Sequence, residues 1–344
     1  MGKAPTRSHT VYFLGAGFSK GYGLPLTSEL LQCLEELAGR PEGKFLNEGQ
    51  QLFNRLKAVF KSFYPDGEHN GFRPSVVDFF ASLSTYVDLS RSFNSTSFPG
   101  GNPAAFLRLL KLGIARILID RTRDEFESVV KSKELGKVVR PGVIVITSNW
   151  DPLVEAVARA KDVPLRRALS TTGKERGKEL TLLKLHGSVD WLRVADRKAR
   201  TVDDDFRPLT TLTAKTDNVG KLSTAAEDII RVSWDLSTAW QRIKARADAP
   251  HIVTMATGKI DDLGPLEQVW RDAYSALSMA KELHIVGYSM PADDTEIRTL
   301  LRAGVQRGTK RPTVSVRNPS PDVHERVRRF VLPAIRSDFS SIVR

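Results

Sequence analysis

The chain has 344 residues, 41% of them hydrophobic, which is enough for one large α/β domain or two smaller ones. Its single cysteine, Cys33, excludes an intramolecular disulfide and a multi-cysteine zinc site. No stretch approaches about 18 consecutive apolar residues, so we expect no membrane-spanning helix and a cytoplasmic protein. The net charge of +12 suits a nucleic acid, an anionic small ligand or an acidic partner, or simply a solvated basic surface.

The first predicted element is a short β-favouring strand, Val11 to Leu14, that leads directly into the sequence GAGFSKG at residues 15–21. An amphipathic helix is predicted next, over Thr27 to Leu37. A strand, a glycine turn and a helix N-terminus can bind a phosphate, because glycine lets the backbone approach it. The spacing G-x-G-x-x-x-G departs from the dinucleotide fingerprint, and no Walker lysine follows. This segment is therefore either a nucleotide site or a tight turn without a ligand.

Helical periodicity continues between about residue 47 and residue 136. Four segments have apolar residues at three- and four-residue spacings: Gln50 to Phe63, Ser75 to Leu89, Pro103 to Ile119, and Arg121 to Leu135. The sequence RSFNSTSFPGGN, residues 91–102, has the composition of a loop. We predict a single domain over residues 1–344 with a helical insertion or subdomain over residues 40–140.

Strands and helices alternate in the rest of the chain. Strands are predicted at residues 143–147, 182–185, 251–255, 283–286 and 313–316, and helices at residues 152–160, 224–247, 266–280 and 294–306. Residues 193–222 are predicted to form a loop, whose run Asp203 to Asp205 is either solvated or a metal site. This alternation is typical of an α/β fold with a doubly wound, mainly parallel Rossmann-like sheet.

Small and polar residues follow five of the predicted strands. The segments are GAGFS at 15–19, TSNWD at 147–151, HGSVDW at 186–191, GYSMPADD at 287–294 and RNP at 317–319. Ligands of such sheets bind at the carboxyl ends of the strands. We therefore expect the five segments to meet at one crevice.

These motifs, in this order, resemble the sirtuin superfamily. The sequence GYS-x-P followed by the helical TEIRTLL is similar to sirtuin-like domains of bacterial antiphage defence proteins, which hydrolyse NAD rather than deacylate proteins. Two departures from the deacylases support this narrower resemblance. One cysteine cannot supply their four zinc ligands, and Leu26-Thr27-Ser28 stands where they have a Phe-Arg pair.

The resemblance implies that NAD binds as a substrate and that no metal is needed. Asn149 would position the attacking water near the nicotinamide ribose, and His186 would act as general base. The implied NAD-binding groups are the amides of Gly15, Ala16 and Gly17, the Ser19 hydroxyl, Asp151 at the nicotinamide, Gly287 and Ser289 at the adenosine, and Asn318 at its ribose or base. Purely structural alternatives are helix caps at Asn149 and Asp151, a buried histidine, and a tight turn at Gly287.

The implied function is hydrolysis of NAD⁺ to nicotinamide and ADP-ribose, as an NAD-depleting effector in antiphage defence. Because the sequence shows no separate sensing domain, we expect an activating protein partner, such as a HerA-type ATPase or an Argonaute-like protein, and self-assembly into a homo-oligomer. Three alternatives are a regulatory subunit that senses NAD or ADP-ribose without turnover, a DNA-associated subunit of a defence complex, and a protein deacylase.

Overall fold

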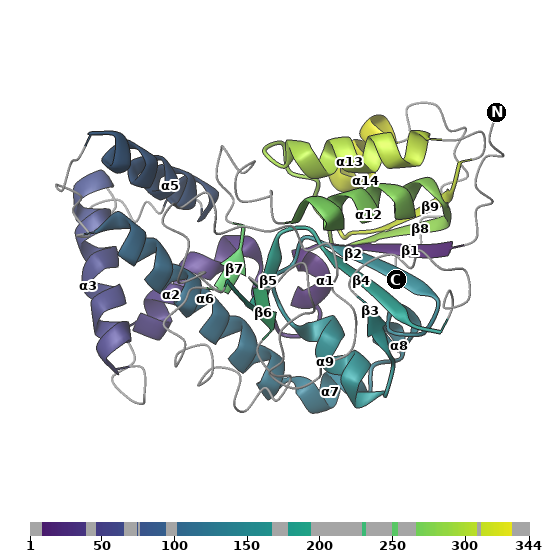
Figure 1. Cartoon of the computed structure of the whole chain (residues 1–344), viewed down its shortest axis with the longest axis horizontal. Helices are drawn as coiled ribbons and strands as arrows, with labels where there is room; N and C mark the ends of the chain where they lie inside the picture. The colour runs from purple at the N-terminus through teal and green to yellow at the C-terminus, as the bar shows by residue number, and fades with distance from the viewer. Residues whose placement is uncertain are drawn as a thin grey trace.

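The computed structural model describes residues 9–38, 46–64, 74, 76–93, 102–166, 178–193, 229–231, 250–253, 266–307 and 311–331. Six strands form the main sheet in the order β3-β4-β2-β1-β8-β9, and every neighbouring pair is parallel (Figure 1). They are β1 His9–Leu14, β2 Val143–Thr147, β3 Leu165–Arg166, β4 Leu180–Lys184, β8 Ala280–Val286 and β9 Thr313–Arg317. The doubly wound, mainly parallel α/β sheet predicted from the sequence is confirmed.

Helices cover both faces of this sheet, because alternate strand residues enter two different cores. Val11 and Phe13 of β1 belong to one apolar cluster, and Leu14 belongs to the other. The first face is covered by α12 Glu267–Ser278, α13 Thr295–Gln306 and α14 Pro321–Val331, which lie above the sheet in Figure 1. The second face is covered by α7 Phe126–Val130, α8 Lys133–Val138 and α9 Leu153–Ala160, which lie below it.

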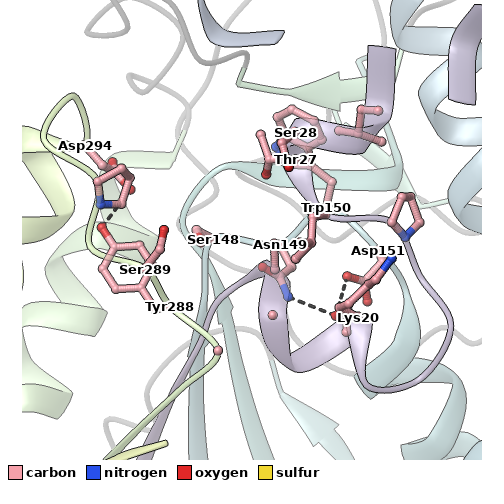
Figure 2. A pocket seen from close by; sticks show the side chains of 18 of the residues that line it. Lys20, Thr27, Ser28, Ser148, Asn149, Trp150, Asp151, Tyr288, Ser289 and Asp294 are labelled. Atoms are coloured by element: carbon pink, nitrogen blue, oxygen red, sulfur yellow. Dashed lines mark hydrogen bonds between the residues drawn. The ribbon is translucent and has the colours of Figure 1, made fainter. Parts of the chain in front are cut away.

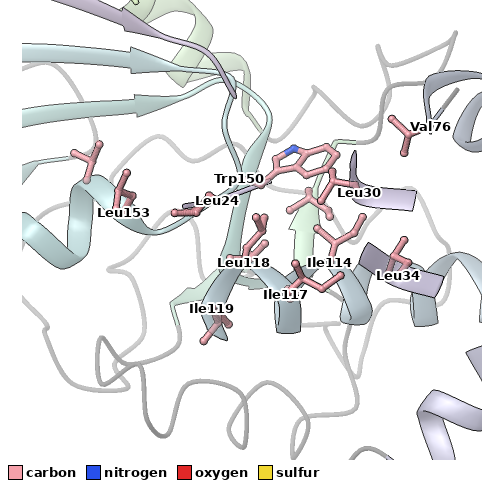
Figure 3. Close-up of a cluster of buried hydrophobic side chains, with 14 of the residues drawn as sticks. Leu24, Leu30, Leu34, Val76, Ile114, Ile117, Leu118, Ile119, Trp150 and Leu153 are labelled. Carbon is pink, nitrogen blue, oxygen red and sulfur yellow. The ribbon is translucent and has the colours of Figure 1, made fainter. Parts of the chain in front are cut away.

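The predicted helical region lies between β1 and β2 in the sequence and to one side of the sheet in Figure 1. Its longer helices are α2 Leu30–Ala38, α3 Leu46–Phe63, α5 Val76–Phe93 and α6 Pro103–Asp124. Figure 3 shows Ile114, Ile117 and Leu118 of α6 close to Leu30 of α2 and to Trp150 after β2. These helices therefore share a hydrophobic core with the second face of the sheet. The division into a domain and an insertion stays a prediction.

Three predictions in the helical region need correction. The helix expected over Arg121 to Leu135 is the end of α6 followed by α7 and α8, because the Ser132 side chain accepts a hydrogen bond from the Leu135 amide at 3.2 Å and starts a new helix. The loop expected over residues 91–102 is wrong at its first three residues, since α5 continues to Phe93, and residues 94–101 lie outside the described residues. The helix expected from Thr27 begins as a 3₁₀ turn, η1 Thr27–Glu29, ahead of α2.

A second sheet, which the sequence did not reveal, lies beside the first. Its strands β5 Gly187–Arg193, β6 Ile229–Arg231 and β7 Pro250–Ile252 pair antiparallel in the order β6-β5-β7. A helix was predicted over 224–247, but its residues 229–231 form strand β6. The strand predicted at 251–255 corresponds to β7 and belongs to this sheet rather than to the parallel one. Pairing with β5, which is distant in sequence, outweighs the local helical pattern. Arg193, the first residue of the predicted 193–222 loop, is the last residue of β5. Residues 194–222, including Asp203 to Asp205, lie outside the described residues.

Candidate active site

A cavity of about 920 Å³ lies at the carboxyl ends of the parallel strands. Pockets for small ligands have volumes of roughly 300–1,000 Å³, so this one can hold a dinucleotide-sized molecule. Segments that follow β1, β2, β4, β8 and β9 all contribute to its lining, as predicted. The lining includes nine of the ten predicted site residues: Ala16, Gly17, Ser19, Asn149, Asp151, His186, Gly287, Ser289 and Asn318. The tenth, Gly15, is buried and is absent from the lining.

The glycines of the first loop make close backbone contacts with the loop after β8. The Gly15 amide donates to the Val286 carbonyl at 3.0 Å, and the Gly17 amide donates to the Gly287 carbonyl at 2.8 Å. A Cβ on Gly287, whose φ is +64°, would lie 1.9 Å from the Phe18 nitrogen. We call this contact, residues 15–18 against 286–288, the glycine seam.

The glycine seam changes the interpretation of the GAG sequence. Two of the three amides predicted to hold a pyrophosphate, those of Gly15 and Gly17, already donate to carbonyls of the protein. The helix that begins at this turn is the five-residue α1 Ala16–Lys20, which was too short to be recognised from its periodicity. The glycines therefore have a packing role, and the phosphate-binding role of their amides stays a prediction.

Asn149 is held in one orientation by hydrogen bonds from both of its side-chain protons. Its Nδ2 donates to the Gly15 carbonyl and to the Ser19 hydroxyl, each at 2.9 Å. A carbonyl accepts but cannot donate, so the amide nitrogen must face Gly15. Figure 2 shows the side-chain oxygen on the opposite side, toward Tyr288 and Ser289. Asn149 therefore presents a hydrogen-bond acceptor to the cavity.

Asp151 continues this hydrogen-bond chain and also supports α9. It is 7% exposed, and its Oδ2 accepts from the Ser19 hydroxyl at 2.8 Å (Figure 2). Its Oδ1 accepts from the Leu153 amide at 3.1 Å, in the first turn of α9. Asp151 thus supports the first turn of α9 without being its N-cap residue, which is Pro152, and this support is compatible with a place in the cavity lining.

His186 lies in the turn between β4 and β5 and is 5% exposed. Its ring is tilted against the Trp270 ring at 6.3 Å between centroids, and its carbonyl accepts from the Val253 amide at 2.9 Å. Gly187 follows with φ of +75°, and a Cβ there would lie 2.1 Å from the His251 carbonyl. The buried position fixes His186 while leaving it part of the cavity lining.

The loop after β8 is held by a buried tyrosine that the sequence did not single out. The Tyr288 hydroxyl donates to Asp294 at 2.8 Å, as Figure 2 shows. Burial, together with the charge of Asp294, raises the pKa of Tyr288 far above its ordinary value, so the hydroxyl stays protonated. Asn318 extends this support, because its Nδ2 donates to the Tyr288 carbonyl at 3.4 Å and its Oδ1 accepts from the Ser320 amide at 3.0 Å.

Two cations that sequence reasoning did not assign also line the cavity. Lys20 pairs with Glu29 at 2.7 Å, and this hydrogen bond lowers the pKa of the Glu29 carboxyl. Arg317 pairs with Glu134 of α8 at 2.9 Å. Both cations could approach an anionic ligand, since each pair is at the protein surface. The feature that could have indicated them is their position, since Lys20 is the last residue of α1 and Arg317 is the last residue of β9.

Two features are absent from the described ranges of the chain. No three His, Cys, Asp or Glu side chains in those ranges cluster as a metal site. No helix in the same part of the chain is long and apolar enough to cross a membrane.

No protein-family model matches the chain, and no curated protein does. The solved structures similar to it include Sir2 proteins. A Sir2 homologue mutant in complex with ADP-ribose is 15% identical with a TM-score of 0.34, over 91% of this chain and 81% of that one. A Sir2 homologue with NAD is 15% identical with a TM-score of 0.31, over 91% and 79%. A Sir2 mutant with a p53 peptide and NAD is 16% identical with a TM-score of 0.29, over 95% and 93%.

Proposed function

We propose that this chain hydrolyses NAD⁺ to nicotinamide and ADP-ribose. The observation that carries the proposal is the oriented side-chain oxygen of Asn149, which faces a dinucleotide-sized cavity that His186 also lines. An acceptor fixed in this way can position a water molecule or a ribose hydroxyl.

The reaction suits these two residue types. The bond between the ribose C1′ and the nicotinamide nitrogen breaks, and the electron pair leaves with the nicotinamide, which needs no proton because its ring is already cationic. Water adds to C1′ and loses a proton. In this proposal His186 takes that proton, since imidazole ordinarily titrates near neutral pH. Asn149 would hold the water or the neighbouring hydroxyl.

The test is direct measurement of nicotinamide release from NAD⁺ by the purified chain. Asn149→Ala and His186→Ala should each lower turnover by about 10²-fold or more. Asn102→Ala is the matched control, because Asn102 also makes a local side-chain hydrogen bond, to the Ala105 amide at the start of α6, and does not line the cavity. Wild-type turnover in both cavity variants would contradict the assignment of these residues.

We further propose that the activity depletes NAD as an antiphage effector in the cytoplasm, and that a protein partner or a homo-oligomeric assembly activates it. This proposal rests on the sequence resemblance. NAD⁺ should fall in cells that express the chain with its activating partner and should be maintained with Asn149→Ala. Binding of NAD without turnover, even in the assembly, would favour the sensing alternative instead.

A further inference from the structure

Lys184 is a charged residue at the end of the apolar strand β4, and its side chain is 1% exposed. Its ammonium group has three N–H donors. Three oxygens lie close to Nζ: the Asp151 carbonyl at 2.6 Å, the Ser188 hydroxyl at 2.7 Å and Oε1 of Glu155 at 3.2 Å. The Trp150 carbonyl lies at 3.4 Å. The ammonium therefore contacts two consecutive carbonyls of the loop that follows β2.

The charge of this ammonium is compensated within the protein. Glu155 of α9 is also 1% exposed, and the Ser188 hydroxyl donates to Asp190, which is 4% exposed. Burying an ion costs several kcal/mol even after relaxation, and an apolar side chain of similar size avoids that cost. An apolar side chain at Lys184, however, offers no donor to the loop carbonyls.

The position of Lys184 relates the two predicted catalytic residues to each other. His186 follows it by two residues, and the carbonyls bound by Nζ belong to the residues directly after Asn149. We propose that Lys184 is a positioning residue that fixes the Asn149 loop relative to the His186 turn. This proposal rests on the proposed function for its kinetic consequence, and its structural consequence can be measured independently.

The decisive variant is the double substitution Lys184→Met with Glu155→Leu, which removes both charges and avoids leaving the buried glutamate without its cation. We expect kcat for NAD⁺ to fall about 10²-fold, because a small misplacement of reacting groups has an effect of that size. KM should change little, since the substitutions are outside the cavity lining. Hydrogen–deuterium exchange should accelerate over residues 148–153, and the thermal midpoint should stay close to that of wild type.

The matched control is Arg166→Met with Glu179→Leu. This pair is less buried, with side chains 18% and 22% exposed; it links β3 to the residue just before β4, and neither member lines the cavity. Its removal should leave kcat and the exchange of residues 148–153 unchanged. If the double variant does not fold, Ser188→Ala replaces it, because this substitution removes the hydroxyl that accepts one of the three hydrogen bonds from Lys184 Nζ. For this variant we expect a smaller loss of kcat and faster exchange over residues 148–153.

The outcomes separate the two proposals. Faster exchange over 148–153 in the Lys184 variant, but not in the control, supports positioning when kcat also falls. If the wild type does not hydrolyse NAD⁺, the faster exchange alone supports it. Unchanged exchange in a folded Lys184 variant overturns positioning. Unchanged kcat together with faster exchange also overturns it, because the loop would then move without affecting the reaction. No turnover by the wild type, even in its activated assembly, overturns the proposed function alone.

Discussion

On one wall of the cavity, side chains hold one another in place: Asn149, Ser19 and Asp151 form a chain of hydrogen bonds, and buried Lys184 binds the carbonyls behind them. On a second wall, formed by the loop after β8, backbone hydrogen bonds and close contacts of the glycine seam hold the structure, and Ser289 is exposed. The comparison indicates that the first wall is built for fixed chemical groups and the second for close approach of two loops. Substitutions should therefore affect activity on the first wall and stability on the second.

The largest effect is expected from Gly287→Ala on the backbone wall. The added Cβ would lie 1.9 Å from a backbone nitrogen, at a φ of +64°, so the seam must open. We expect a loss of about 3 kcal/mol or more in the free energy of unfolding, measured by chemical denaturation. Gly21→Ala is the control, because its Cβ would meet only the Phe18 carbonyl at 3.4 Å. Equal stability of the two variants would contradict a packing role for the seam.

A smaller effect on stability, with a large effect on activity, is expected from Asn149→Asp on the side-chain wall. The carboxylate keeps the size of the side chain but removes both protons that bind Gly15 and Ser19. We expect turnover of NAD⁺ to fall about 10²-fold, as measured by nicotinamide release, while the protein remains folded by circular dichroism. Retained turnover would show that the orientation of this amide is unimportant.

Tyr288→Phe should have an intermediate effect on stability. It removes the donor to buried Asp294, which should lower the free energy of unfolding by about 1–3 kcal/mol. Tyr22→Phe is the matched control, because the hydroxyls of Tyr22 and Ser132 are 3.3 Å apart and only partly buried. Denaturation curves of the two variants should differ, and coincident curves would argue against the Tyr288 contact as a support of the loop.

The smallest effect concerns His284, which lies on β8 and is away from the cavity lining. Burial lowers its pKa below the ordinary value of 6.5, so the unfolded chain binds the proton more readily than the folded one. Its contribution to stability should be present above about pH 6.5 and should be lost as the pH falls toward the lowered value. The unfolding free energy of the wild type minus that of His284→Gln should therefore decrease as the pH is lowered from 7.5 to 5. A constant difference over this range would contradict the expectation.

The sequence predicted the parallel sheet well because its strands are short apolar runs bounded by glycine or polar residues. The prediction for β2 has the same bounds as the strand, and the run of Val11 to Leu14 lies within β1. It failed at β6, where long-range pairing decides the structure, and at α1, which has five residues. These two elements depend on contacts that local periodicity does not contain.

The candidate site was located by one rule, that strand ends of a parallel sheet meet. The individual residues came from the sirtuin resemblance; nine of the ten are in the lining, but their presence there does not show what each one does. The sequence suggested that the glycines bind phosphate, whereas two of their amides bind another loop. Lys184 was missed because the sequence does not show that Glu155 and the Asp151 carbonyl lie beside its ammonium group, and its role depends on those contacts.

The most direct test of the account is the rate of nicotinamide release from NAD⁺ by the wild-type chain, Asn149→Ala and His186→Ala, each in the presence and absence of the activating partner. The account predicts turnover by the wild type in the activated assembly and a loss of about 10²-fold or more in both variants, with their folds intact. Turnover that is the same in all three proteins would contradict it, and so would an activated wild type that binds NAD⁺ and leaves it uncut.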